Sequence, residues 1–499
     1  MRLTDPFYYL ENFRSMLETL MRRDGDLLLP EELNFIAGFF RLPKRSGALL
    51  ARLIMRKGPL FRARRLLYPE IGAVEDAVRP LIDLRWVTAL PANLEGAPEP
   101  VQLVFWSETA DTVFRLEVGK LCERLRLMFF GNFHQGWSEF VLSDLGILKY
   151  EKICMHGESR PFATRRHVED FHRLHRCREM LRLGNDPAAV ELAMPPRIAD
   201  CDWLEELREQ LRFHVGRAHE RAGEFARALA IYSTCTHPGA RVRAARLGGA
   251  SGRRTAARET RRAKIVPAFP VFELTIDGRA EGAPVECRVR DRLMRDADEE
   301  TTVHYVENGL INSLFGLLCW PAVFAPVPGA FFHSYHHGPA DLPSALFVER
   351  RKREFARCLA ELECGTYRRT ILQRFIEKQG IASPFVSWGL IDEPILRRAL
   401  ECVPTSHLRA WFEWMLGDLR ANRSGFPDLV QFWPRSRRYR MIEVKAPGDR
   451  LQDSQRRCLE FSLSHNVPVS VCRVRWTGAG ESGGPAASCL GFRAALLHP

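Results

Sequence analysis

The sequence is poor in lysine and has no excess of acidic residues. Of its 499 residues, 73 are Lys or Arg and 61 are Asp or Glu, which gives a net charge of +12. Nine of the basic residues are lysines and 64 are arginines. Because 46% of the residues are hydrophobic, the composition excludes histone-like tails and disordered activators. It indicates a folded, multidomain protein with an acidic partner.

Closely spaced cysteines and a secretory signal are also absent. The 13 cysteines, from Cys122 to Cys489, include no C-x-x-C pair, and their number is odd. This pattern excludes a zinc ribbon and a disulfide framework. The N-terminal segment MRLTDPFYYLENFRS lacks the apolar run of a signal peptide. We expect a reduced, cytoplasmic protein, associated with the nucleoid in a bacterium or nuclear in a eukaryote.

The sequence also lacks an uninterrupted apolar segment that could span a membrane. Residues 310–332 carry no formal charge and are slightly longer than the roughly 20 residues that cross a bilayer. Pro321, Pro326 and Pro328 interrupt this stretch. It therefore predicts a buried helix followed by a loop.

Residues 7–95 have helical patterns, and residues 110–205 are again mainly helical. Residues 91–100 between them are rich in proline, alanine and glycine, which indicates a domain boundary. Arg56 and Lys57 lie in a basic cluster beside a Gly-Pro turn, which indicates either a phosphate-binding surface or a solvated basic face. Residues 216–232 fit one tetratricopeptide (TPR) repeat, with a plain helical hairpin as the alternative. Residues 241–264 contain eight arginines, either in a linker that lies on nucleic acid or in a solvated helix. After them VFELTIDG predicts a strand, and a long helical pattern opens near Val303.

Residues 424–476 contain the candidate catalytic residues, and their pattern predicts the order strand, turn, strand, helix, strand. LVQFW and YRMIEVK have strand composition and are separated by the turn-forming residues Pro-Arg-Ser-Arg. If Trp433 pairs with Arg438 across this turn, Asp428 pairs with Glu443. Strand alternation also puts Glu443 and Lys445 on the same face. Two carboxylates and a lysine then converge on one spot, while the side chain of the intervening valine points into the core.

This combination suits hydrolysis of a phosphodiester. Carboxylates and backbone carbonyls are the hard ligands that Mg²⁺ and Mn²⁺ prefer. Such an ion polarises a phosphodiester and lowers the pKa of a bound water. Lys445 would orient that water and offset the charge that develops on the phosphate. The bare P-D…E-x-K pattern also occurs by chance, and a surface lysine on an edge strand is the alternative.

The same residues resemble a known family. GFPDL, IEVKAPGDRLQDSQ and the closing VCRV resemble the VRR-NUC form of the PD-(D/E)XK nuclease fold. Upstream, YYLENF, RKGPLFR, FFGNFHQGWSEFVLSDLG, YVENGLINSLFGLLCWPAVF and GPADLP resemble the Fanconi-associated nuclease family, in the same order. The resemblance covers about residues 7–476, which makes it specific, and the expected member is a bacterial one.

The resemblance implies a metal-dependent, structure-selective DNA nuclease of phosphodiesterase I type. Such an enzyme cuts 5′ flaps, degrades DNA from a 5′ end and acts in the repair of interstrand crosslinks. The resemblance assigns catalysis to Asp428, Glu443 and Lys445. It assigns the binding of Mg²⁺ or Mn²⁺ to Glu307, Asp428, Glu443 and the main-chain carbonyl of Val444. Gln455 has a supporting role. From the residues alone, Glu307 is a glutamate favoured by the dipole of the following helix.

Other basic residues are candidates for contact with the DNA. Arg420 and Arg423 precede the catalytic strand and would hold a terminal phosphate or the strand to be cut, with solvated arginines as the alternative. Together with Arg56 and Lys57 they form the predicted DNA-binding set. We interpret the histidines at 333, 336 and 337 as loop residues that pack on aromatic rings, not as a metal site.

Some positions depart from the family pattern. Pro321 stands where an acid often follows the tryptophan, Ala446 replaces a glycine, and Ser454 replaces a residue that is frequently basic. The cysteine and histidine spacing of a ubiquitin-binding zinc finger is absent.

The expected partner is flapped or branched double-stranded DNA with a 5′ end. No membrane partner is expected, and a homodimer on DNA is a further expectation.

Together these patterns predict a multidomain chain, mainly α-helical in its N-terminal two thirds, with a C-terminal α/β nuclease domain. The expected regions are an N-terminal helical, SAP-like DNA-binding region (1–95), a helical DNA-binding region (96–205), a TPR-like region with a basic linker (206–265), a helical lead-in that carries Glu307 (266–384), a VRR-NUC core (385–476) and a flexible tail (477–499).

Two other functions remain open from the sequence. One is a nuclease with the same core and another target, such as a junction resolvase or a restriction-like enzyme. The other is a non-catalytic DNA-binding scaffold that acts in repair.

Overall fold

The computed structural model describes residues 5–56, 58–90, 112–153, 155, 159–250, 269–277, 283–297 and 300–477. The chain forms two compact units. The first contains Met1–Ile147 and Gly157–Lys264, and the second contains Leu148–His156 and Ile265–Pro499. The predicted boundary segment at 91–100 and the predicted tail after Thr477 lie outside the described residues.

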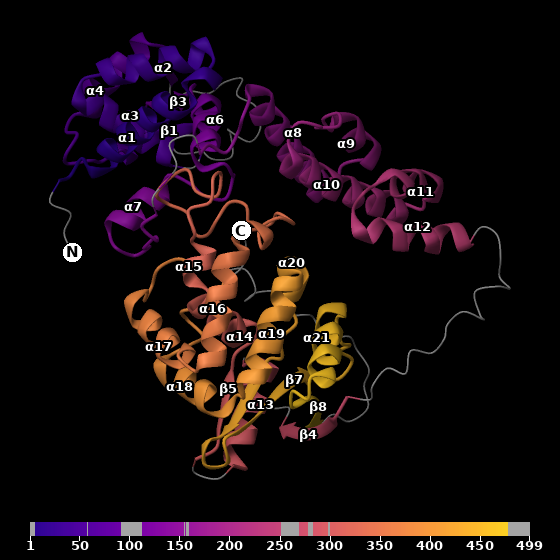
Figure 1. The fold of residues 1–499 in the computed structure, drawn as a ribbon. Coiled ribbons are helices and arrows are strands. Elements are labelled where there is room, and N and C mark those ends of the chain that lie inside the picture. Colours follow the sequence, from indigo (N-terminus) through magenta and orange to yellow (C-terminus); the bar gives the residue numbers. More distant parts are fainter. Residues whose placement is uncertain are drawn as a thin grey trace. The chain divides into compact units, whose positions relative to one another are not determined.

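The first unit begins with helices and a small sheet (Figure 1). Its helices are α1 (Tyr8–Asp24), α2 (Pro30–Arg41), α3 (Lys44–Met55), α4 (Val74–Asp83), α6 (Gly119–Phe130) and α7 (Ser138–Asp144). Its strands are β1 (Leu60–Arg62), β2 (Val87–Leu90) and β3 (Val113–Leu116), in the antiparallel order β1-β3-β2. The prediction of helix throughout residues 7–95 was wrong at β1 and β2. Strands this short carry too few residues for a period of two to show.

Five further helices complete the first unit: α8 (Arg165–Arg182), α9 (Pro187–Ala193), α10 (Asp202–Arg221), α11 (Phe225–Thr234) and α12 (Pro238–Ala250). In the TPR-like segment, Gly216 lets the ring of Tyr232 approach, since an added Cβ would lie 2.7 Å from Tyr232 Cε1. Arg243 and Arg246 lie 2.6 and 2.9 Å from Glu220. The first part of the basic stretch therefore belongs to a helix packed on its neighbour, and residues 251–264 lie outside the described residues.

The second unit is built on a five-stranded mixed sheet in the order β4-β8-β7-β6-β5. The strands are β4 (Val271–Asp277), β5 (Thr302–Tyr305), β6 (Leu429–Trp433), β7 (Arg438–Lys445) and β8 (Val469–Thr477). β8 runs parallel to both β4 and β7, whereas β5, β6 and β7 pair antiparallel. The expected strand at VFELTIDG is confirmed as β4. The helical pattern expected near Val303 is wrong, because that residue lies in β5. Both edge strands thus come from residues before the expected 385–476 core.

Helices cover both faces of this sheet. The helices of the second unit, within the described residues, are α13 (Val285–Arg295), α14 (Gly309–Leu318), α15 (Trp320–Val323), α16 (Lys352–Cys364), α17 (Tyr367–Glu377), α18 (Glu393–Cys402), α19 (Thr405–Gly417), α20 (Leu419–Asn422) and α21 (Asp453–Ser464). Tyr439 and Met441 of β7 pack into the large core with α14 and α19, whereas Ile442 and Val444 pack with α13. The alternation of β7 therefore divides its side chains between two apolar layers. The predicted fold class is confirmed.

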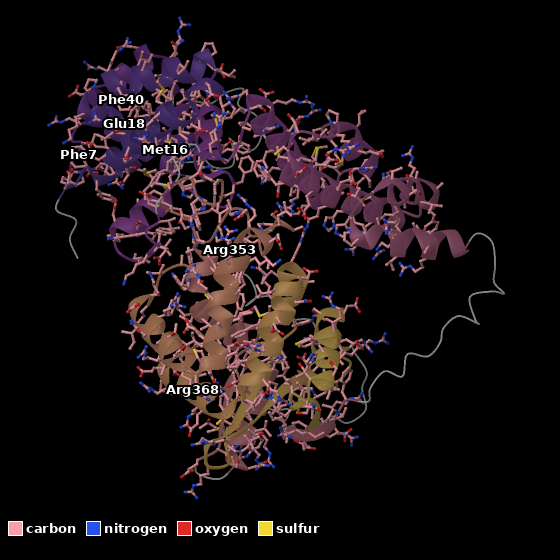
Figure 2. All side chains as sticks on the ribbon, in the orientation of Figure 1. Phe7, Met16, Glu18, Phe40, Arg353 and Arg368 are labelled. Atoms are coloured by element: carbon pink, nitrogen blue, oxygen red, sulfur yellow. The ribbon has the colours of Figure 1, made fainter. Side chains whose placement is uncertain are left out.

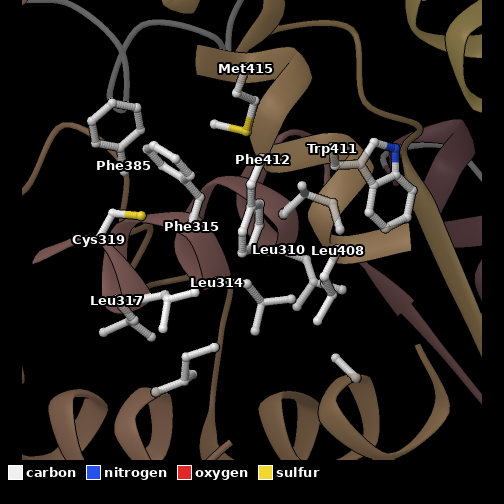
Figure 3. Packing of buried hydrophobic residues seen from close by; sticks show 14 of the residues in the cluster. Leu310, Leu314, Phe315, Leu317, Cys319, Phe385, Leu408, Trp411, Phe412 and Met415 are labelled. Atoms are coloured by element: carbon white, nitrogen blue, oxygen red, sulfur yellow. The ribbon is translucent and has the colours of Figure 1, made fainter. Parts of the chain in front are cut away.

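The apolar helix α14 is the centre of the large core. All ten of its residues are buried, and Leu310, Leu314 and Phe315 face Leu408 and Phe412 of α19 (Figure 3). The prediction of a buried helix followed by a loop is confirmed. Polar side chains such as Arg353 project from the outer surface instead (Figure 2). Within the described ranges, no helix is both long and apolar enough to cross a membrane.

A buried ion pair fixes the loop that follows α15. Arg351 is fully buried, and its Nη1 and Nη2 lie 2.8 Å from the two carboxylate oxygens of Asp341. Asp341→Ala is expected to lower the free energy of unfolding by about 3–5 kcal/mol, because it leaves a buried guanidinium without its counter-charge. Urea denaturation measures this loss. Glu393→Ala removes an exposed partner of Arg397 and is expected to cost less than about 0.5 kcal/mol. Equal losses in both variants would contradict the prediction.

Candidate active site

Two acidic side chains meet where β6 and β7 pair. Trp433 pairs with Arg438, and the register continues to Leu429 opposite Ile442, as predicted. Asp428 stands one residue before β6, and its Oδ2 accepts a hydrogen bond of 2.8 Å from the backbone N–H of Val444. Glu443 is fully buried in β7. The hairpin register therefore brings the Asp428 carboxylate to the Glu443–Val444 segment.

Lys445 completes the constellation from the same face of β7. Its Nζ lies 2.8 Å from Glu443 Oε1, which confirms the predicted shared face. The same Nζ donates to Gln455 Oε1 at 3.1 Å, and that oxygen also accepts from the backbone N–H of Gln452 at 2.9 Å. Gln455 lies in the first turn of α21. The ammonium group is thus fixed between a buried carboxylate and a helix-borne amide.

Glu307 approaches the site from the segment between β5 and α14. The backbone N–H groups of Val306 and Glu307 both donate to the main-chain carbonyl of Asp428, at 2.8 and 3.2 Å. The Glu307 carboxylate accepts a short hydrogen bond from the hydroxyl of Tyr305. The segment before the apolar helix α14 and the start of the β6–β7 hairpin, far apart in sequence, therefore meet through the Asp428 main chain.

Hydrogen bonds with Asn308 and Asn312 hold the segment before Asp428 at the same site. Asn308 Oδ1 accepts from the backbone N–H of Phe426 at 3.0 Å. Asn312 Nδ2 donates to the carbonyl of Arg423 at 2.8 Å. Gly425 adopts φ +93°, and an added Cβ would lie 2.5 Å from the carbonyl carbon of Ser454. Glycine is required here because the backbone has a left-handed φ and touches the start of α21.

The site concentrates negative charge in a poorly solvated environment. Burial raises the pKa of Asp428, and the Glu443 charge raises it further. Burial also raises the pKa of Glu443, against the lowering effect of Lys445, while Glu307 and Glu286 add to the rise. Glu286, in α13, also adds to the rise for Asp428. Glu286 could not be predicted from the sequence, since a glutamate in the first turn of a helix that only tertiary packing brings to β7 carries no local signal.

The donor set fits a divalent cation. Both carboxylate oxygens of Glu443 are buried; Oε1 has the Lys445 ammonium at 2.8 Å, and Oε2 has no hydrogen-bond partner among the described residues. A buried carboxylate oxygen without a partner suits a cation, and carboxylate oxygens are the ligands that Mg²⁺ and Mn²⁺ prefer. Among the residues that the structure describes, no three His, Cys, Asp or Glu side chains form a ready metal-binding group. In this arrangement Glu443 faces Lys445 and Glu307 faces Tyr305.

The predicted DNA-binding arginines divide between the two units. Arg423 is half-buried beside the site, where burial lowers the pKa of its guanidinium. Arg420 is exposed on α20. Arg56 belongs to the first unit, where its Nη1 donates to the Tyr68 hydroxyl at 3.2 Å. Lys57 lies outside the described residues.

The histidines after α15 pack on aromatic rings. The rings of His333 and His336 stack with centroids 3.8 Å apart, and His336 lies edge-on to Phe332 at 4.5 Å. His337 lies 5.4 Å from the ring of Tyr150. Their interpretation as loop residues that pack on aromatics is confirmed.

The chain matches two protein-family models and relatives that are named as nucleases. The VRR-NUC domain model matches residues 363–476, and the FAN1 HTH domain model matches residues 7–88. The chain is 42% identical to the Fanconi-associated nuclease 1 homolog of Pseudomonas aeruginosa, over 95% of this chain and 97% of that protein. The homolog of Arabidopsis thaliana is 23% identical, over 94% of this chain and 67% of that protein.

A solved structure agrees over nearly the whole chain. The crystal structure of paFAN1 bound to DNA with a 2-nt 5′ flap and a gap matches with a TM-score of 0.85 and 40% identity, over 96% of this chain and 100% of that chain. The VRR-NUC domain implies dependence on a divalent metal ion. The chain is a DNA-hydrolysing repair nuclease and belongs to the Fanconi-associated nuclease family, as a bacterial-type member.

Proposed function

We propose that the protein is a 5′-flap endonuclease and 5′-to-3′ exonuclease of phosphodiesterase I type, and that it acts in the repair of interstrand crosslinks. The observation that carries the proposal is that buried Asp428 and Glu443 meet Lys445, joined by the Asp428–Val444 hydrogen bond and the Lys445–Glu443 contact. The complex of paFAN1 with 5′-flap DNA supports flapped DNA as the substrate.

In this proposal the acidic residues bind the metal ion, and Lys445 orients the water that attacks the phosphate. Glu307, Asp428, Glu443 and the main-chain carbonyl of Val444 hold Mg²⁺ or Mn²⁺, which supplies a Lewis acid for the phosphodiester when it is bound. Lys445 orients the attacking water and offsets the charge on the phosphate. Gln455 positions Lys445 through the 3.1 Å hydrogen bond.

The arginines would hold the DNA around this centre. Arg423 and Arg420, which flank the segment before β6, suit a terminal phosphate or the strand to be cut, because guanidinium groups bind phosphate oxygens bidentately. Arg56 and Lys57 would bind phosphates through the first unit. The homodimer on DNA, the six-region division and the absence of a ubiquitin-binding finger stay predictions.

A panel of labelled DNA substrates tests the function. The protein is incubated with Mg²⁺ or Mn²⁺ and a 5′ flap, a 3′ flap, a four-way junction or a nicked duplex. Cleavage of the 5′ flap near its branch, followed by stepwise loss from the 5′ end, is expected. Preferred cleavage of the four-way junction would favour a resolvase. A crosslinked duplex with a 5′ flap tests the repair step, for which cuts on both sides of the crosslink are expected.

Gln455 gives a test of the positioning role. Gln455→Ala is expected to lower the cleavage rate about 10-fold, because Lys445 loses the acceptor that fixes its Nζ. Gln455→Glu keeps a side-chain oxygen that can accept the hydrogen bond from Lys445, and it is expected to retain most of the rate. Single-turnover cleavage at saturating enzyme measures both, so that binding does not contribute. If the two variants lose the same activity, or neither loses any, Gln455 does not position Lys445.

A further inference from the structure

Two helices of the first unit carry the same basic pattern. Residues 175–182 of α8 and 214–221 of α10 both read H-x-x-R-x-x-x-R. Spacings of three and four residues put the members of each pattern on one face of its helix. α8 and α10 pack on each other, and a cavity of about 420 Å³ is lined by five of the six pattern residues together with Leu181 and Leu211. We call it the α8–α10 groove.

The fold leaves most of the positive charge of this groove without a counter-charge. Arg182 lies 2.9 Å from Glu179. Within the described part of the chain, Arg178, Arg217 and Arg221 form no ion pair, and all three are exposed. Burial lowers the pKa of His214, and the charges of Arg217 and Arg178 lower it further. Cations of both helices therefore lie close enough to His214 to affect its ring. Like charges at these spacings destabilise a helix. Their clustering therefore does not serve the stability of the unit.

We propose that the α8–α10 groove binds the sugar-phosphate backbone of duplex DNA. Guanidinium forks match phosphate oxygens, and such contacts need no particular base sequence. The lining contains no Phe, Tyr or Trp side chain on which an unpaired base could stack, which favours a duplex over a single strand. The proposal rests on DNA as the substrate of the proposed function. It adds a backbone contact in the unit that does not contain Asp428.

A pair of matched variants tests the groove. Arg178→Gln with Arg217→Gln removes two charges from the groove, one from each helix. Arg173→Gln with Arg176→Gln removes two charges from exposed positions on the opposite side of α8. The affinity for a labelled duplex is measured at several salt concentrations in EDTA, which blocks cleavage. The groove variant is expected to bind more weakly, with a salt slope that is smaller by about 0.9 for each lost phosphate contact. The control variant is expected to bind as the wild type does.

The outcomes separate DNA binding from folding and from catalysis. Arg178→Lys with Arg217→Lys keeps the charge and is expected to retain most of the affinity. Equal affinity losses in the groove and control variants, or wild-type affinity in the groove variant, would overturn the proposal. So would a lower melting temperature of the groove variant, or a loss of affinity for single-stranded DNA alone. Because EDTA prevents cutting, a wild type that fails to cut a 5′ flap would reject the proposed function without altering this result.

Discussion

Asp428→Asn is expected to lower the rate of 5′-flap cleavage by more than about 10³-fold, with the protein still folded and bound to DNA. Asparagine is isosteric and keeps an oxygen that can accept the 2.8 Å hydrogen bond from Val444. It removes the negative charge that the proposed metal ion needs. Single-turnover cleavage in Mg²⁺ and DNA binding in EDTA measure the two properties separately.

The stability of this variant gives an independent check. The Glu443 charge raises the pKa of Asp428, so the two carboxylates oppose each other when both are ionised. Removal of one charge is therefore expected to leave the melting temperature in EDTA unchanged or higher. Lys445→Ala is expected to lower cleavage about 10²–10³-fold, and to lower stability, because Glu443 loses the cation 2.8 Å away. If wild type and both variants cut equally, the assigned chemistry is wrong.

Gly425→Ala is expected to disrupt the site without touching any of its charged groups. The new Cβ would lie 2.5 Å from the carbonyl carbon of Ser454 and 2.8 Å from the backbone nitrogen of Gln455, at a φ of +93°. Backbone cannot yield as a flexible side chain does, so the start of α21 must shift and take Gln455 away from Lys445. We expect a loss of roughly 2–5 kcal/mol in the free energy of unfolding and a loss of most cleavage activity.

Gly448→Ala is the matched control for this substitution. Gly448 has a similar φ of +89°, but an added Cβ would meet nothing within 4 Å. Only backbone strain remains, which costs about 1 kcal/mol. Urea denaturation and single-turnover cleavage of both variants measure the difference. If Gly425→Ala were no worse than Gly448→Ala in either measurement, the contact with α21 would not hold the site together.

The β6–β7 hairpin could be predicted from the sequence because its geometry is local. A turn of four residues fixes which residues of the two strands face each other, and a period of two fixes which side chains share a face. Trp433 opposite Arg438 therefore places Asp428 near Glu443, and alternation places Lys445 beside Glu443. The buried character of α14 was equally readable, since its apolar residues continue around the whole helix.

The rest of the site depended on segments that only the folded chain brings together. β5 has four residues, too few for a periodic signal, and its strand conformation comes from its pairing with β6. That pairing places Glu307 beside Asp428, while the packing of α13 brings Glu286 near the same carboxylates. The contact of Gly425 with α21 has the same origin.

The sequence by itself determined the hairpin register, the shared face of Glu443 and Lys445, and the buried helix after Glu307. The tertiary structure decided which distant elements surround that hairpin: both edge strands, the helix with Glu286, and the turn of α21 that fixes Lys445 through Gln455. The physical reason is the range of the interactions. Turn length and side-chain alternation act between near neighbours, whereas the pairing of segments more than a hundred residues apart depends on the packing of the whole unit.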